Sequence, residues 1–333
     1  MDKAAQTTEN AVEESSVPTS RKKQILLTVG KSLISAFLIY LILRGTNFTE
    51  IFAAMKKAYL PLLLLSFTLH FVGFYVSALR WKTLLKVHKV DSNLWFLIKS
   101  YIVAMFFNNF LPSTVGGDTV RAYDSYRLGK SKSGAVAVVF VDRFLGLTAL
   151  ILYAFIAAFF AKSITQRVPY LNLWVSIAAV GMLFIIWLIF MPSRKLAEWV
   201  GKIRIPFSAK LQRLLMKLID AFWTFRGQKM ALLKALGLSL LLQANVVFYY
   251  FLISSALGFH IPLYNFFLIV PLSIFIMMIP VSINGIGLRE NVFFFFLATF
   301  AVAKPEAIAF AWIEYGILML QGVLGGIVYA FRK

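Results

Sequence analysis

Two short and similar stretches interrupt otherwise apolar sequence: Leu111-Pro112-Ser113-Thr114-Val115-Gly116-Gly117-Asp118-Thr119-Val120-Arg121 and Ile279-Pro280-Val281-Ser282-Ile283-Asn284-Gly285-Ile286-Gly287-Leu288-Arg289. Each contains proline, a hydroxyl residue, a β-branched residue, glycine, an aliphatic residue and arginine at the same spacing. Proline removes a backbone donor and glycine tolerates positive φ, so each stretch predicts an interrupted helix. The alternative is a pair of loop turns that resemble each other by chance.

The composition indicates a membrane protein. Of the 333 residues, 60% are hydrophobic and 16% are aromatic, which is more than soluble domains contain. We therefore expect an all-α polytopic membrane protein in the cell membrane. The chain has no cysteine, so disulfides, thiolate metal sites and cysteine nucleophiles are excluded. Its three histidines are scattered, and we expect neither a metal site nor a cofactor.

The charges between apolar segments predict the topology. Nine segments are apolar: 25–43, 59–79, 93–111, 134–161, 170–191, 230–257, 263–280, 288–303 and 306–331. If all nine crossed the bilayer, the basic loop 194–229 would lie on the side opposite to Arg21, Lys22 and Lys23. Such an arrangement would invert the positive-inside rule at its strongest point.

The conflict disappears if two units enter and leave the bilayer on one side. We predict that 93–131 re-enters from the cytoplasm and 263–303 from outside, as an inverted pair. About six full transmembrane helices remain, with both termini in the cytoplasm. Residues 1–24 are predicted to be a disordered tail, and 25–333 a membrane transport domain. The basic, amphipathic segment 194–229 is expected either along the inner leaflet or as a hairpin packed on the core.

Polar backbone at membrane depth survives only where it is buried in protein or lines a wet cavity. Paired interruptions at corresponding points of two halves are typical of a transport site. We assign the interruptions to six residues: Pro112, Gly116, Gly117, Pro280, Gly285 and Gly287.

Charged residues near the interruptions are candidate functional residues, because a charge at the bilayer centre costs roughly 2.5–3.5 kcal/mol. Arg121 and Arg289 are predicted to bind a lipid phosphate, since the planar guanidinium donates two hydrogen bonds and stays charged. Free N–H groups where the helix resumes would add to this anion site. Asp118 and Glu290 would neutralise the arginines without ligand. The alternative, an arginine that snorkels to the interface, suits Arg121 better than Arg289.

Further polar residues are expected to satisfy the bends or to line a polar cavity that opens sideways to lipid. The predicted set is Asn108, Asn109, Asp118, Asp142, Arg143, Asn284 and Glu290. Asp142 and Arg143 are interpreted as a buried partner pair or a structural salt bridge. Glu314 lies inside the last span. Arg80 is interpreted as an interfacial anchor at a helix end, and Asn245 as a cross-link between helices.

The stretch from Phe107 to Arg121, followed by Val141-Asp142-Arg143, resembles the transmembrane region of lysylphosphatidylglycerol synthases. So does the stretch from Pro280 to Glu290. The resemblance covers nearly everything after the tail. It implies a flippase-like membrane protein, because that region is associated with moving aminoacylated phospholipid between leaflets. The chain ends at Phe331-Arg332-Lys333, so we expect no aminoacyl-transferase domain and no enzymatic activity.

Together these observations predict a flippase-like protein that translocates a phospholipid or other anionic lipid. A separate lipid-modifying enzyme is a candidate partner, no nucleic acid is expected, and the oligomeric state stays open. Two alternatives remain. One is an integral membrane transferase acting on a lipid-linked phosphate, with Asp118, Asp142 or Glu290 as its carboxylate. The other is a secondary transporter of a small anion.

Overall fold

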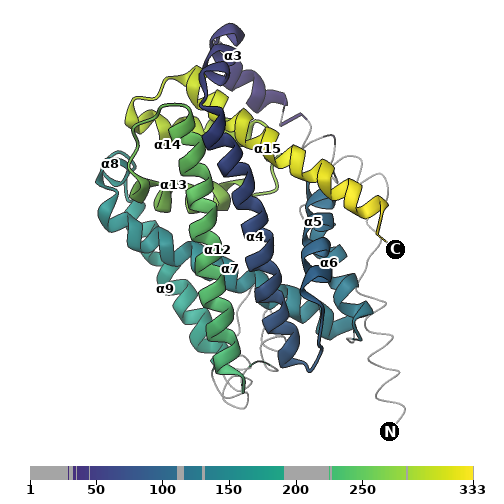
Figure 1. Ribbon diagram of the computed structural model, residues 1–333. Coiled ribbons are helices and arrows are strands. Elements are labelled where there is room, and N and C mark those ends of the chain that lie inside the picture. Colours follow the sequence, from purple (N-terminus) through teal and green to yellow (C-terminus); the bar gives the residue numbers. More distant parts are fainter. Residues whose placement is uncertain are drawn as a thin grey trace.

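The computed structural model describes residues 36–44, 46–110, 116–129, 132–190, 227–282 and 284–332, together with Val29, Leu33, Ile34 and Phe225 (Figure 1). The predicted tail 1–24, Pro112 and residues 194–224 of the amphipathic segment lie outside this part of the chain. Within it, every regular element is a helix.

The helices vary widely in length. Their bounds are α3 (Phe48–Lys57), α4 (Leu60–Val87), α5 (Leu94–Phe110), α6 (Gly116–Arg127), α7 (Lys132–Phe160), α8 (Lys162–Thr165), α9 (Leu171–Phe190), α12 (Lys229–Ala256), α13 (Leu263–Met277), α14 (Leu288–Leu297) and α15 (Lys304–Ala330). A short 3₁₀ turn, Ala298–Phe300, follows α14.

Four helices are long and apolar enough to cross a membrane: α4, α7, α12 and α15. A fifth candidate is a pair bent by 84°, Ala36–Leu43 with α3. The four long helices coincide with four of the six crossings that the sequence predicts, and α9 and residues 36–43 lie where the other two are predicted. The all-α polytopic architecture is therefore confirmed.

The order of the helices repeats. A first unit, α4 to α7, reads long, short, short, long, with 28, 17, 12 and 29 residues. A second unit, α12 to α15, reads the same way, with 28, 15, 10 and 27 residues. At 1.5 Å per residue, α5 and α13 are each shorter than the roughly 30 Å hydrocarbon core. Each interrupted motif joins the two short helices of its unit.

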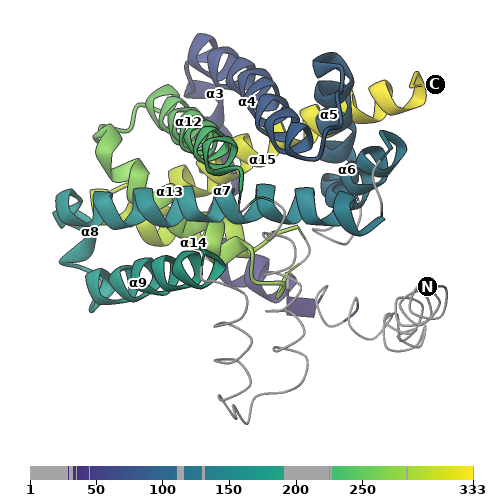
Figure 2. The ribbon, with the colours of Figure 1, turned by 90° about the horizontal axis from the view of Figure 1, so that it is seen from below.

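The first helices of the two units lie side by side and run in opposite directions (Figures 1 and 2). The backbone N–H of Tyr59, just before α4, donates to the carbonyl of Ala256, the last residue of α12, at 2.8 Å. Further along, Asn245 Nδ2 of α12 donates to the carbonyl of Leu69 in α4 at 2.9 Å. Asn245 is thus a cross-link between helices, as predicted, and the first helices of the two units are antiparallel.

The first short helix of each unit packs on the opposite unit. Helix α5 lies on α15, and α13 lies on α7. The α5–α15 contact is very close: a Cβ at Gly325 would lie 2.3 Å from the carbonyl oxygen of Ile102, and one at Gly326 would lie 3.0 Å from the Phe106 ring. Glycine on α15 therefore allows α5 to approach, as small residues do between membrane helices.

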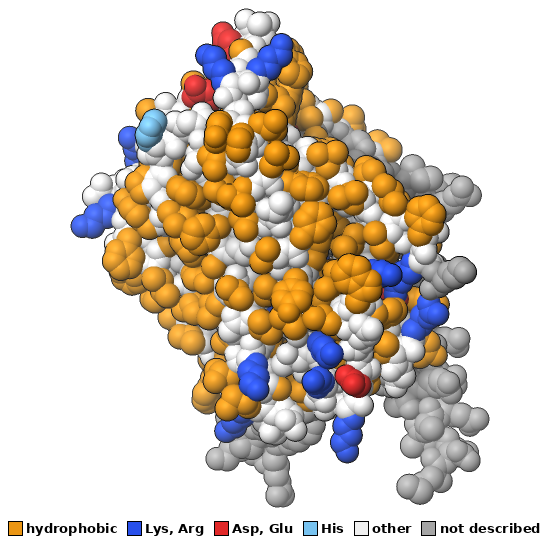
Figure 3. All heavy atoms as spheres, in the orientation of Figure 1, with side chains coloured by type: hydrophobic (Ala, Val, Ile, Leu, Met, Phe, Trp, Pro, Cys, Tyr) orange, Lys and Arg blue, Asp and Glu red, His pale blue; other side chains and the backbone are white. Residues whose placement is uncertain are grey.

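Hydrophobic side chains cover a broad band of the surface, and Lys and Arg gather toward its two ends (Figure 3). The exposed large side chains include Leu64, Trp174, Val180, Leu183, Leu233, Leu241 and Leu320. A surface of this kind fits lipid tails in the middle and water or headgroups at the ends.

Candidate functional site

The first interrupted motif ends in a buried ion cluster, which we call the Asp142 cluster: Arg80, Tyr101, Arg121 and Asp142. Arg80 of α4 donates from Nε to Asp142 Oδ1 at 2.6 Å and from Nη2 to Oδ2 at 2.9 Å. Arg121 of α6 donates from Nη2 to Asp142 Oδ2 at 2.8 Å. The hydroxyl of Tyr101 reaches the same oxygen at 3.2 Å. Asp142 is 1% exposed, and it joins α4, α5, α6 and α7.

Aromatic rings complete the surroundings of Arg121. Its guanidinium carbon lies 4.2 Å from the centre of the Tyr101 ring and 5.0 Å from that of Trp81. Since cations are stabilised over aromatic faces, these rings replace part of the hydration that Arg121 loses on burial. The position of Arg80 contradicts the prediction. It does not anchor a helix end at the interface but lies buried at the carboxylate, because α4 packs against α12 and α7.

A more exposed ion pair lies beside this cluster. Arg143 Nε lies 2.9 Å from Asp118 Oδ2, and Arg121 Nη1 lies 3.7 Å from Asp118 Oδ1. The Arg143 side chain is 48% exposed. Asp142 and Arg143 thus both pair with residues of the first interruption, as predicted, but only Asp142 is buried. Consecutive residues of a helix point in different directions, so Asp142 faces the core and Arg143 the surface.

The second motif ends in a corresponding cluster, which we call the Glu314 cluster: Tyr249, Tyr250, Arg289 and Glu314. Arg289 Nη1 of α14 donates to Glu314 Oε2 of α15 at 2.5 Å. The hydroxyl of Tyr250 donates to Glu314 Oε1 at 2.9 Å, and that of Tyr249 to the Glu314 carbonyl at 3.3 Å. The Arg289 guanidinium carbon lies 4.7 Å from the centre of the Tyr315 ring.

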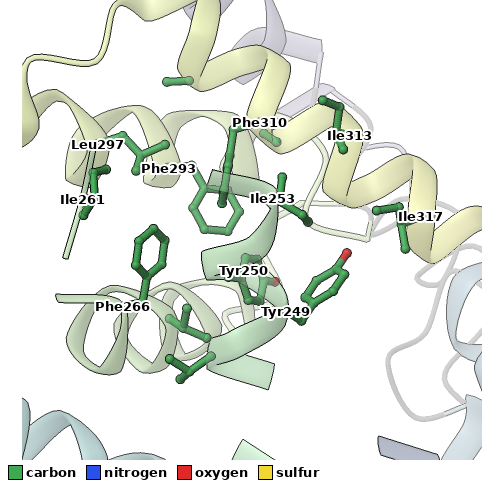
Figure 4. Close-up of a cluster of buried hydrophobic side chains, with 14 residues drawn as sticks. Tyr249, Tyr250, Ile253, Ile261, Phe266, Phe293, Leu297, Phe310, Ile313 and Ile317 are labelled. Carbon is green, nitrogen blue, oxygen red and sulfur yellow. The ribbon is translucent and has the colours of Figure 1, made fainter. Parts of the chain in front are cut away.

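Buried apolar side chains surround Tyr249 and Tyr250 of this cluster (Figure 4). The Phe293 ring packs between Tyr250 and Phe310, with centres 5.5 and 5.0 Å away. Phe293 and Phe310 are 0% exposed and Glu314 is 1% exposed. Part of the Phe293 to Phe296 run therefore forms core, while Phe295 is 54% exposed.

The two clusters occupy equivalent places in the two units. Asp142 lies ten residues after Lys132, the first residue of α7, and Glu314 lies ten residues after Lys304, the first residue of α15. Each pairs with the arginine four residues after the repeated glycine of its motif. The motif therefore repeats together with a carboxylate on the following long helix.

The third partner differs between the units. Arg80 lies seven residues before the end of α4 at Val87. The residue seven before the end of α12 is Tyr249, next to the Tyr250 that binds Glu314. A second cation in the first unit is thus replaced by neutral hydroxyls in the second.

The N–H groups where the helices resume are not free, which corrects our expectation. In the first motif Gly117 N–H donates to Asn108 Oδ1 at 2.8 Å. In the second, Gly287 N–H donates to Glu290 Oε2 at 2.8 Å, and Gly287 is the N-cap of α14. Glu290 therefore caps its own helix, whereas Glu314 neutralises Arg289.

The second motif contacts the end of α5, just before the first motif, through two asparagines. Asn284 Nδ2 donates to the Asn109 carbonyl at 2.6 Å, and Asn109 Nδ2 donates to the Leu318 carbonyl of α15 at 2.6 Å. The structure thus brings residues 175 positions apart into direct contact. Both asparagines serve the bends and bind backbone carbonyls.

The interrupting residues act in different ways. Helix α13 ends at Met277, before Pro280, and the turn that follows contains positive φ angles at Asn284 (50°), Gly285 (76°) and Gly287 (81°). Gly116 begins α6. Gly117 lies inside α6, where a Cβ would come within 2.5 Å of the Ala104 carbonyl oxygen. The second motif therefore uses glycine for backbone freedom, and the first uses it for close approach.

Both motif arginines keep one unused donor. Arg121 and Arg289 are 4% and 8% exposed, so neither guanidinium is open to lipid in this conformation. The Nε of each is buried and has no hydrogen-bond partner in the described part of the chain. A buried unpaired donor costs about 1–3 kcal/mol. The same atom is left unpaired in both units, within the described part of the chain.

Long apolar helices that alternate with shorter ones and carry buried ion clusters define an all-helical polytopic membrane protein. The sequence model described as the lysylphosphatidylglycerol synthase TM region matches residues 28–325. The chain therefore belongs to that family, as its motifs predict.

Two relatives are similar over most of their length. A UPF0104 membrane protein of Pyrococcus horikoshii is 25% identical over 328 residues, covering 92% of this chain and 96% of the relative. A UPF0104 membrane protein of Methanothermobacter thermautotrophicus is 26% identical over 318 residues, covering 88% of this chain and 90% of the relative. Both names describe membrane proteins.

Proposed function

We propose that this protein translocates a phospholipid or another anionic lipid between membrane leaflets, with Arg121 and Arg289 binding the lipid phosphate. The observation that carries the proposal is the equivalent pair of buried arginines, each bound to a carboxylate of the following long helix and each with Nε unpaired in the described part of the chain. A phosphate that replaced the carboxylate would accept from Nε and one Nη together, the bidentate geometry that favours arginine over lysine.

The surroundings supply a route to these arginines. Arg143 is an exposed cation on the long apolar helix α7, directly beside Asp142 and paired with Asp118. An anionic headgroup at the lipid surface would meet Arg143 first. Next along this route lies Arg121, which also contacts Asp118. The acyl chains would stay against the hydrophobic band while the headgroup moves along a polar path that would open between the motifs.

The environment of the carboxylates favours transport over a transferase. Asp142 is bound by two arginines, Asp118 by Arg143, and Glu290 by the Gly287 N–H. Each is neutralised or used as a cap, whereas a transferase needs a carboxylate that is free to act as a base or to hold Mg²⁺. The protein would act in the cell membrane with both termini in the cytoplasm, and a separate lipid-modifying enzyme would supply its cargo.

Translocation in liposomes containing the purified protein tests the proposal. Fluorescent phosphatidylglycerol would be compared with fluorescent phosphatidylcholine, and uptake of radioactive phosphate would test a small-anion transporter. We expect movement of phosphatidylglycerol that is strongly reduced in Arg121→Ala and Arg289→Ala. Arg167→Ala, an exposed arginine in the turn after α8, is the control and should retain activity.

Two outcomes would overturn the proposal. Phosphate uptake without lipid movement would identify a small-anion transporter. Folded protein that moves neither lipid nor phosphate, with or without a proton gradient, would favour a transferase. Arg289→Ala leaves Glu314 without its cation and could therefore unfold the protein. The double variant Arg289→Gln with Glu314→Gln keeps the site neutral, so it separates loss of phosphate binding from loss of folding.

A further inference from the structure

The charge balance differs between the two clusters. The first holds Arg80, Arg121 and Asp142, so two cations share one anion. The adjacent Asp118 and Arg143 neutralise each other. The second holds Arg289 and Glu314, and Glu290 is close enough to interact with both of them electrostatically. The first cluster therefore carries an excess positive charge, and the second an excess negative charge.

This difference decides which carboxylate is suited to exchange a proton. A proton on Asp142 would leave Arg80 without its anion and Arg121 with only Asp118, at 3.7 Å, in a site with 1% exposure at the carboxylate. Burying an uncompensated charge is unfavourable. A proton on Glu314 would instead remove the excess negative charge and leave Arg289 with Glu290 nearby.

Few ionisable groups near Glu314 could bind the proton in its place. Helix α14 contributes Arg289 and Glu290, and α12 contributes Tyr249 and Tyr250. Tyr315 of α15 interacts with Arg289 and Glu314. His70 of α4 packs edge-on against the Tyr249 ring, with centres 4.3 Å apart.

Two further helices pack on α15, and their charged side chains point away from the cluster. On α3 these are Glu50, Lys56 and Lys57, all exposed. On α5 the charged residue is Lys99, which is exposed and lies near the Trp95 ring. The ionic partners of Glu314 therefore come from α14.

We propose that Glu314 binds the proton that drives lipid movement, and that its protonation releases Arg289 to bind the lipid phosphate. This inference rests on the proposed function. The proton passes from the aqueous phase to the Glu314 carboxylate, the ion pair to Arg289 Nη1 breaks, and the phosphate accepts from the freed guanidinium. No covalent bond forms or breaks apart from the one to the transferred proton.

The geometry supplies the phosphate position. In the ion-paired state, the Nε and Nη2 edge of Arg289 faces Gly285, whose Cβ position lies 3.9 and 3.8 Å from these atoms. Nε is the donor that has no partner in the described residues. A ligand phosphate that bound this edge would therefore lie beside the turn of the second motif.

Proton and phosphate are bound together in this scheme, so they cross together. The expected result is symport, in which lipid accumulates in the leaflet that faces the more alkaline side. With one proton per singly charged lipid, the leaflet ratio should reach about tenfold per pH unit of imposed gradient.

The experiment uses liposomes that contain the full chain, fluorescent phosphatidylglycerol and an internal pH dye. The wild type should accumulate lipid on the alkaline side and acidify the interior when lipid enters. Glu314→Gln should still exchange lipid between leaflets but show neither accumulation nor proton entry. Glu306→Gln, an exposed carboxylate at the start of the same helix, is the matched control and should behave as the wild type.

A second variant guards against a Glu314→Gln protein that does not fold. Tyr250→Phe removes only the hydroxyl that donates to Glu314, so the pH of half-maximal accumulation should move upward. Lipid exchange by the wild type without accumulation under the gradient would overturn the inference and leave the proposed function intact. Accumulation that persists in Glu314→Gln would also overturn it. Absence of any lipid movement would refute the proposed function itself, and the inference with it.

Discussion

The two units carry the same arginine–carboxylate pair, but different side chains surround it. In the first, a second arginine from α4 reaches the carboxylate, and in the second, two tyrosines from α12 take that place. The repeat therefore preserves the ion pair and the position of its carboxylate, while the third partner sets the charge. The same buried ion pair can therefore occur in both units of a repeated fold and have a different role in each.

The predicted inverted arrangement of the two units can be tested most decisively by labelling from the two sides of the membrane. The chain has no cysteine, so single cysteines can be labelled from either side of a membrane. We predict that Tyr126→Cys, in α6, is labelled from the cytoplasm and Tyr264→Cys, in α13, from outside. Both positions are exposed. Labelling of both from the same side would contradict an inverted pair of re-entrant units.

Removing each carboxylate should destabilise the units unequally. Asp142→Ala removes the carboxylate that pairs with two buried arginines, of which only Arg121 retains another, Asp118 at 3.7 Å, and Glu314→Ala removes the partner of one arginine, which retains Glu290 nearby. Breaking one buried pair costs about 3–5 kcal/mol, so Glu314→Ala should fall in that range and Asp142→Ala at or above its upper end. Thermal unfolding in detergent, followed by tryptophan fluorescence, measures the difference. A less stable Glu314→Ala protein would reverse the comparison.

The close contact between α5 and α15 can be tested with a control on the same helix. Gly325→Ala places a Cβ 2.3 Å from a backbone oxygen, whereas a Cβ at Gly316 meets nothing within 4 Å. We expect Gly325→Ala to lower the free energy of unfolding by about 1–3 kcal/mol through overpacking. Gly316→Ala should be neutral or slightly stabilising, since alanine favours helices. Equal stability of the two variants would argue against this packing.

The repeated glycines should respond differently to the same substitutions. Gly117→Ala introduces a clash with the Ala104 carbonyl, while Gly285→Ala has room but must adopt a φ of 76°. The left-handed conformation costs an alanine about 1–2 kcal/mol, and asparagine tolerates it better. Gly285→Asn should therefore be milder than Gly285→Ala, whereas Gly117→Asn should be worse than Gly117→Ala. Unfolding measurements on the four variants would show whether the order holds.

Much of the fold was predictable, because the apolar segments and the repeated motif are local patterns. The turn at Asn284, Gly285 and Gly287 follows directly from residue types that accept positive φ. The contact between Asn109 and Asn284 agrees with the prediction that both motifs contribute to one polar site, but its geometry depends on tertiary packing.

The partners of the arginines were not predictable from neighbouring residues. Arg80 precedes Trp81 and Lys82 near a helix end, a pattern typical of an interfacial anchor, and only the packing of α4 and α7 places it at Asp142. Glu314 carried a usable signal, because it occupies the same position in its long helix as Asp142 does. Tyr250 lay in an apolar run that gave no sign of its bond to Glu314.

The most direct test of the central claim is translocation of fluorescent phosphatidylglycerol by Arg121→Lys and Arg289→Lys, with the exposed Arg167→Lys as control. Lysine retains the charge that each carboxylate needs but cannot reproduce the bidentate fork. We predict that both variants fold and lose about tenfold in the rate of translocation, the equivalent of about 1.4 kcal/mol. Arg167→Lys should be unaffected. Wild-type rates in Arg121→Lys and Arg289→Lys would contradict phosphate binding by the paired arginines.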